Sequence, residues 1–241
     1  NGKTWDINLI FKKNNFDIIY HFGEYSRIVH SFADIDFVSK SIVSGTLEVL
    51  KFAIKNNSKL IYSASSSKFG NDGNDENLSP YAFFKSKNIE LIKNYKKWFG
   101  LNYEICYFFN VYGKNHISTG KYATVIAIFE NQYKNNQNLT VVSPGNQSRN
   151  FTHIDDVIDG VIKVSKQTSN GEFYLGYYKN FEIMDVALRF QKEIKILDTR
   201  LGERFKSEIF ESDTNRLLDW KANIDLFEYI DDFKSSIKKN Y

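Results

Sequence analysis

A chain of 241 residues with 42% hydrophobic and 16% aromatic residues can bury a core in one large or two small domains. Its net charge of +3 comes from scattered positive residues, so the sequence does not indicate nucleic-acid binding, although it suits a small anionic substrate. Cys106 is the only cysteine, which excludes a disulfide framework, and we expect no metal site. Without a signal peptide or a run of about 20 apolar residues, we expect a cytoplasmic protein with no membrane span.

The first half of the chain alternates short apolar runs with longer helical patterns. The patterns predict a helix over residues 37–55 and strands over residues 16–22, 59–63 and 103–109. Continuous apolar strands that alternate with helices are typical of a parallel sheet with covering helices, so the predicted fold class is α/β. Ligands bind beyond the carboxyl ends of such strands, where residues 21–24 (His-Phe-Gly-Glu), Ser65 and Asn110 lie.

A further helix, over residues 81–98, carries a tyrosine and a lysine on one face. Ser79 and Pro80 precede it, and these residue types suit a cap and a first helical turn. Tyr81 and Lys85 are four residues apart, so the phenol and the ammonium are neighbours on the helix. A nearby ammonium favours the phenolate form, which can take a proton from an alcohol.

A serine-rich segment follows the second predicted strand and leads toward this helix. Ser65 can hydrogen-bond a substrate oxygen while Tyr81 acts on its proton. Serine-rich segments are usually loops, and a tyrosine and lysine at this spacing often occur by chance. Their combination in the order strand, loop, helix favours a catalytic site over either chance explanation.

The pattern of residues in the second half of the chain predicts a smaller α/β lobe. Helical patterns cover residues 122–133, 154–166 and 227–239, and short strands cover residues 139–142 and 172–175. We therefore expect a sheet-bearing domain over residues 1–115. Residues 116–241 would form mainly a substrate-binding lobe that is interleaved with the sheet.

Several motifs in sequence order resemble the extended short-chain dehydrogenase/reductase family, in its nucleotide-sugar epimerase/dehydratase branch. Tyr81 and Lys85 resemble its Y-x-x-x-K pair, and residues 109–113 (FNVYG) resemble its F-N-V-Y-G segment closely. The remaining motifs lie at residues 16–24, 44–47, 65–70, 147–157, 200–203 and 218–221. Together they cover nearly the whole chain.

The resemblance implies a partial Rossmann domain, NAD as cofactor, a nucleotide-diphosphate sugar as substrate and a homodimer. It makes Tyr81 the base for a sugar hydroxyl, Lys85 the partner of the nicotinamide ribose and Ser65 a hydrogen-bond partner of the same sugar oxygen. The other cofactor contacts that it implies are His21, Phe22, Gly23, Ser63 and Phe108. The substrate contacts that it implies are Ser66, Asn110, Val125, Arg149 and Arg200. His21 could equally be a core residue at the end of a strand.

The largest departure from the family is at the N-terminus. The family opens with a strand and a Gly-x-x-Gly-x-x-Gly turn that cradles the NAD pyrophosphate, and nothing of this kind precedes Phe16. We expect a fragment of a longer enzyme or a truncated relative. Asp6-Ile7 resembles a remnant of an adenine-contacting pair.

Three functions remain open from the sequence. A 4-epimerase returns the hydride to the other face of a 4-keto sugar, whereas a 4,6-dehydratase needs an additional acid and base. The family's dehydratases carry acidic residues just after the catalytic serine or threonine, where this chain has Ser66 and Ser67. The sequence therefore favours an epimerase, and residues 64–67 and 122–126 resemble epimerases that accept N-acetylhexosamine nucleotides. The third function is that of a non-catalytic relative that binds sugar nucleotides but cannot hold NAD.

Overall fold

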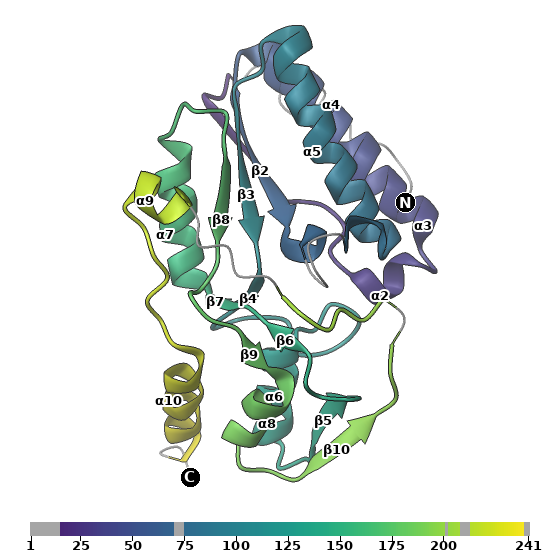
Figure 1. The fold of residues 1–241 in the computed structure, drawn as a ribbon, viewed down its shortest axis with the longest axis vertical. Helices are drawn as coiled ribbons and strands as arrows, with labels where there is room; N and C mark the ends of the chain where they lie inside the picture. Colours follow the sequence, from purple (N-terminus) through teal and green to yellow (C-terminus); the bar gives the residue numbers. More distant parts are fainter. Residues whose placement is uncertain (1–14, 70–74, 201, 208–212, 239–241) are drawn as a thin grey trace.

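A four-stranded parallel sheet, in the order β1-β2-β3-β8, forms the centre of the molecule in the computed structural model (Figure 1). The structure describes residues 15–69, 75–200, 202–207 and 213–238. The four strands are β1 (Ile18–His21), β2 (Lys59–Ser65), β3 (Tyr103–Phe108) and β8 (Glu172–Leu175). The predicted α/β class, with a parallel sheet and covering helices, is confirmed.

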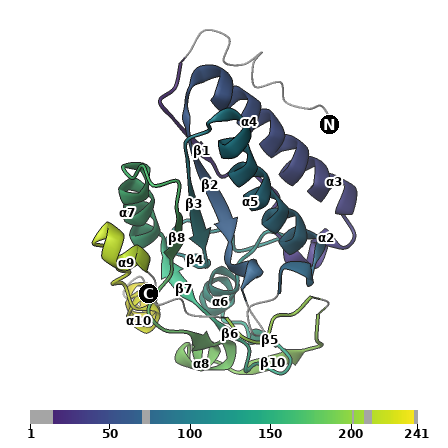
Figure 2. The ribbon, with the colours of Figure 1, turned by 45° about the horizontal axis from the view of Figure 1, so that its top comes forward.

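Helices cover both faces of this sheet (Figure 2). Leu60 and Tyr62 of β2 belong to the apolar cluster that contains residues of α4 (Gly45–Asn56) and α5 (Pro80–Phe99). Ile61, between them, belongs to the cluster that contains residues of α7 (Ile154–Ser165). Successive side chains of a strand point to opposite faces, so a sheet buried on both sides needs apolar residues at consecutive positions.

Helix α5 begins as its sequence predicts. The Ser79 side-chain oxygen accepts a hydrogen bond from the backbone N–H of Ala82 (3.1 Å), and Pro80 is the first helical residue. The helix ends at Gly100, whose φ of 75° is a left-handed conformation that glycine adopts without strain. Of the helices in the described ranges, none has the length and apolar character needed to cross a membrane.

The helix predicted over residues 37–55 is divided into three parts. It consists of α3 (Ile35–Ser39), a π-helical turn (Lys40–Ser44) and α4. The carbonyl of Ile42 in the π-helical turn accepts a hydrogen bond from Asn88 Nδ2 of α5 (2.8 Å). A side chain that bonds to the helix backbone in this way accounts for the interruption.

A smaller lobe of short strands and helices packs below the carboxyl ends of the sheet strands (Figure 1). Its strands pair as β5 with β10 and β4 with β7, both parallel, and β6 with β9, antiparallel. The strands are β4 (Asn110–Tyr112), β5 (Leu139–Val142), β6 (Ser148–Arg149), β7 (Phe151–His153), β9 (Phe181–Glu182) and β10 (Ile194–Leu197). The remaining helices in the described part of the chain are α2 (Ile28–Ser31), α6 (Val125–Lys134), α8 (Ile183–Arg189), α9 (Asp213–Leu218), α10 (Leu226–Lys238) and the 3-10 turns Ser66–Lys68 and Asp75–Asn77.

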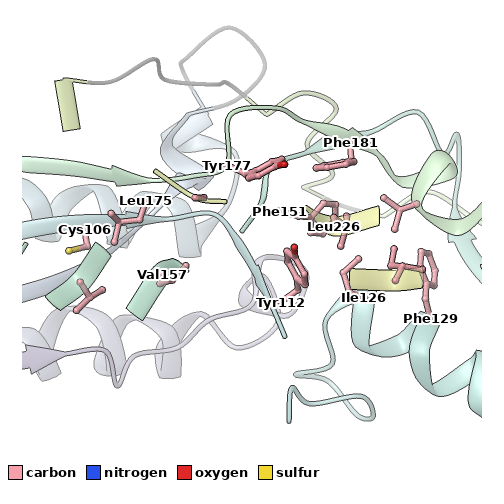
Figure 3. Packing of buried hydrophobic residues seen from close by; sticks show 14 of the residues in the cluster. Cys106, Tyr112, Ile126, Phe129, Phe151, Val157, Leu175, Tyr177, Phe181 and Leu226 are labelled. Carbon is pink, nitrogen blue, oxygen red and sulfur yellow. The ribbon is translucent and has the colours of Figure 1, made fainter. Parts of the chain in front are cut away.

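The sheet and the smaller lobe share one apolar core. Figure 3 shows buried side chains that run from Cys106 of β3, past Tyr112 and Phe151, to Phe129 of α6. All four are at most 1% exposed. The sheet and the lobe are therefore packed together without a solvent layer between these side chains.

Candidate active site

A cleft of about 820 Å³ lies where the carboxyl ends of β2 and β3 meet the smaller lobe. This is the position at which ligands bind in open parallel sheets. Most of the residues that the sequence singled out line it. They are Phe22, Ser63, Ser65, Ser66, Tyr81, Lys85, Phe108, Asn110, Val125, Arg149 and Arg200.

Three of these side chains can act together on an alcohol. Ser65 is the last residue of β2, and its Oγ accepts a hydrogen bond from the N–H of Ser67 (3.2 Å), so its O–H can donate to a ligand. Tyr81 lies in the first turn of α5 and is 9% exposed, and Lys85 lies one turn further along the same helix. The cleft is therefore lined by a hydroxyl donor, a phenol and an ammonium, and these groups are suited to taking a proton from an alcohol.

The ammonium of Lys85 is held by two acceptors. It forms an ion pair with the carboxylate of Glu24 and donates to the backbone carbonyl of Ser63 (2.5 Å), with Ser63 Oγ at 3.5 Å. It also lies over the ring of Tyr62, 4.7 Å from the centroid. An ammonium has three N–H donors, and its longest contact, to Ser63 Oγ, is the one that a ligand in the cleft can replace.

The sequence placed Glu24 just past the end of a strand without giving it a role, and the structure buries its side chain next to Lys85. Its side chain is 2% exposed, and Oε1 accepts hydrogen bonds from Thr46 Oγ1 (2.5 Å) and Asn88 Nδ2 (3.1 Å). Its Oε2 accepts from Tyr62 OH (3.1 Å) and Lys85. Burial alone would raise the pKa of Glu24, but the Lys85 ammonium and neighbouring hydrogen bonds lower it to about 2. The sequence signal was a charged residue directly after a buried strand.

The same contacts keep Lys85 charged. Burial disfavours its ammonium, yet the neighbouring Tyr62 and Glu24 raise the pKa of Lys85 above its usual value. Glu24 and Lys85 are thus ionised together over the whole neutral range.

His21 and Gly23 are placed differently from the other predicted cofactor contacts. The His21 ring is buried, with Nε2 2.8 Å from Thr46 Oγ1 and 3.3 Å from Glu24 Oε1. Its side chain therefore supports Glu24 and does not line the cleft. Gly23 is exposed, and a Cβ there would meet no atom within 4 Å. Contact of either residue with a cofactor stays a prediction.

Two arginines stand at the lobe side of the cleft. Arg149 is paired with Glu203 (2.5 Å) and donates to the carbonyl of Ser148 (2.9 Å). Arg204, which was not predicted, is buried and donates to the carbonyls of Ser66 (2.7 Å) and Phe69 (3.1 Å). Arg204 thereby fixes the turn that follows Ser65, and its only sequence signal was its place directly after the motif at residues 200–203.

Neither a thiol nor a cluster of metal ligands is found among the described residues that line the cleft. Cys106 is buried in the sheet, where burial raises the pKa of its thiol. Within the described ranges, no group of three or more histidine, cysteine, aspartate or glutamate side chains could hold a metal ion.

The parallel sheet and the cleft at the carboxyl ends of its strands give this chain the fold of solved nucleotide-sugar epimerases. The profile of the NAD dependent epimerase/dehydratase family matches residues 3–176, and the chain belongs to this family. NAD is the cofactor of the family. The adenine-contacting pair expected at Asp6-Ile7 lies outside the described residues.

Individual relatives agree with this assignment. A protein described as "Putative UDP-glucose 4-epimerase" from Methanocaldococcus jannaschii is 28% identical over 274 residues, covering 100% of this chain and 86% of that protein. The UDP-glucose 4-epimerase of Thermotoga maritima, solved with UDP-glucose, has a TM-score of 0.89 at 20% identity and covers 97% of this chain and 81% of that one. The UDP-glucuronic acid 4-epimerase of Bacillus cereus, solved with UDP-glucuronic acid and NAD, has a TM-score of 0.86 at 21% identity. The match covers 98% of this chain and 79% of that one.

Proposed function

We propose that the protein is an NAD-dependent nucleotide-sugar 4-epimerase that works through a transient 4-keto sugar. The observation that carries the proposal is the common cleft of Ser65, Tyr81 and Lys85. Tyr81 takes the proton of the sugar hydroxyl while Ser65 holds the same oxygen. Tyr81 returns the proton after the keto sugar has turned over in the cleft.

The side chains around Lys85 fit the nicotinamide end of NAD. The ring of Phe22 is 43% exposed and packs edge to face against Phe108, with centroids 5.4 Å apart. Together with Ser63 and Lys85 they give one wall of the cleft an apolar surface and hydroxyl and ammonium donors. Bound NAD would supply the hydride acceptor for C4 of the sugar.

The charges in the cleft favour an epimerase over a 4,6-dehydratase. Dehydration requires an acid and a base besides Tyr81. Among the described residues that line the cleft, the carboxylates are Glu24 and Glu203, and each is already paired with a cation. The places where a dehydratase would carry its acidic residues hold Ser66 and Ser67.

A panel of nucleotide sugars tests the reaction. We expect UDP-, GDP- or dTDP-hexoses, including N-acetylhexosamines, to be converted to their C4 epimers when protein and NAD are incubated with each sugar and products are followed by NMR. A stable 4-keto-6-deoxy product would show a dehydratase instead. Absence of turnover together with no thermal stabilisation by NAD would show the non-catalytic relative.

We expect Arg149 to bind the substrate diphosphate, since a guanidinium offers paired donors to phosphate oxygens. We expect Arg149→Ala to raise the KM for the nucleotide sugar by roughly 10- to 100-fold, with kcat changed much less, because a charge-assisted hydrogen bond contributes about 1.5–3 kcal/mol. Steady-state kinetics measure this. Arg189→Ala is the matched control, because Arg189 pairs with Asp231 on the surface. An unchanged KM in Arg149→Ala would remove Arg149 from the substrate site.

We also propose that the chain forms a homodimer through α3 and α5. Phe37 of α3 is 58% exposed and Phe83 of α5 is 40% exposed. These helices contact each other, so a second copy could cover both aromatic side chains.

A further inference from the structure

The carboxylate of Glu24 is fully occupied by hydrogen-bond donors. Each oxygen accepts from two groups, Thr46 and Asn88 at Oε1 and Tyr62 and Lys85 at Oε2. A carboxylate that is ionised and saturated in this way cannot serve as the proton acceptor of a substrate. Its function must therefore act through the groups that it contacts.

Among the residues that donate hydrogen bonds to Glu24, Lys85 is the one that also lines the cleft. The Glu24 carboxylate and the Ser63 carbonyl hold the ammonium from different segments of the chain. Taking an ion pair out of water is costly, so a buried pair of this kind is poorly explained as a device for stability alone. Its position beside the catalytic phenol points to a role in the reaction.

We propose that Glu24 is a positioning residue of the catalytic site: it holds the Lys85 ammonium charged and fixed against Ser63, and so sets the upper pH limit at which Lys85 can assist the reaction as a cation. This inference rests on the proposed epimerase function. The negative charge of Glu24 favours the ammonium form of Lys85. Removal of the charge should let Lys85 lose its proton at lower pH.

Several other groups contribute to the electric field at this position. Among the described residues, the titratable and charged side chains that face the pair or Tyr81 are His21 from β1, Glu24, Tyr25 and Arg27 from the following loop, Tyr62 from β2, and Tyr81 and Lys85 from α5. Replacement of Glu24 changes one charge and leaves the other groups in place. The direction of the resulting shift is therefore defined.

The first test is the pH dependence of turnover in Glu24→Gln, which keeps the size of the side chain and removes its charge. We expect the alkaline limb of the pH–rate profile, where Lys85 loses its proton, to move to lower pH by roughly 1 to 3 units. Glu24→Asp retains the charge and should keep the wild-type position of the profile at reduced height. A Glu24→Gln profile that is lower but unshifted would overturn the proposal and show a structural role.

The second test does not need turnover. Acetic anhydride acetylates only neutral amines, so competitive labelling of the cofactor-free protein, followed by mass spectrometry, reports the pH at which Lys85 loses its proton. We expect the labelling midpoint of Lys85 to lie above that of Lys87 in the wild type and to fall in Glu24→Gln. Glu104→Gln is the matched control, because Glu104 is a buried carboxylate beside Lys59 at the other end of the sheet (3.7 Å), and it should leave Lys85 unchanged.

The two tests separate the inference from the proposed function. If no nucleotide sugar is turned over but Lys85 labelling shifts as expected, the epimerase proposal fails and the charge coupling stands. If turnover is found and the Lys85 midpoint is the same with and without the Glu24 charge, the inference fails alone. Should Glu24→Gln not fold, a wild-type Lys85 midpoint at or below that of Lys87 would overturn it.

Discussion

Replacement of Tyr81 by phenylalanine should lower kcat by roughly 10²- to 10⁴-fold, the usual contribution of a positioned general base. This corresponds to about 3–5 kcal/mol of transition-state stabilisation. Phenylalanine keeps the ring, which is 9% exposed, and removes only the phenolic oxygen. We therefore expect the fold and the affinity for NAD to change little, which isothermal titration calorimetry and thermal unfolding measure.

The same helix supplies the control for this experiment. Tyr95 is also a buried tyrosine of α5, but it lies near the far end of the helix and packs in the apolar cluster beneath the sheet. Tyr95→Phe should leave kcat within about twofold of wild type, because surface and core positions away from the reacting atoms do not contribute to proton transfer. Full activity in Tyr81→Phe would remove the phenol from the reaction.

Replacement of Lys85 by methionine should lower the free energy of unfolding by about 3–5 kcal/mol, because it leaves the carboxylate of Glu24 buried without its cation. Adding Glu24→Gln to this variant should recover a large part of the loss. Urea unfolding of the wild type, the two single variants and the double variant gives the coupling energy between the two side chains. Lys87→Met is the control, because Lys87 pairs with Glu90 on the exposed face of the same helix.

The acid end of the stability curve offers an independent check on this pair. The pKa of Glu24 is about 2 in the folded protein, against 4.5 for an unperturbed glutamate. The contribution of the ionised carboxylate is therefore complete above about pH 4.5 and is lost as the pH falls toward 2. The stability difference between the wild type and Glu24→Gln should narrow over that window, and a constant difference would contradict the assignment.

Features of the fold that depend on residues close to one another in the sequence could be predicted. Ser79 and Pro80 marked the start of α5, and apolar runs located β5 and β8 at the observed bounds. The order of motifs located Ser65, Tyr81 and Lys85 on elements that meet at one cleft. The secondary-structure propensities of the residues and the spacing of the apolar side chains are enough to predict such features.

The partners of buried polar groups could not be predicted, because they come from distant parts of the chain. Lys85 is 61 residues from Glu24, and Arg204 is 138 residues from Ser66. No periodic pattern links such pairs, and a glutamate after a strand is usually solvated. Only the folded arrangement shows that the Glu24 carboxylate is enclosed by hydrogen-bond donors.

Strand β8 gives the architecture a consequence for protein engineering. It comes from the second half of the chain, yet it pairs with β3 along residues 105–108, at the edge of the catalytic sheet. A shortened version that stops near residue 115 would leave this edge of β3 unpaired and strip the apolar covering from Cys106. The half that carries the tyrosine and lysine is therefore no autonomous module, and grafting it elsewhere would require a substitute for the missing strand.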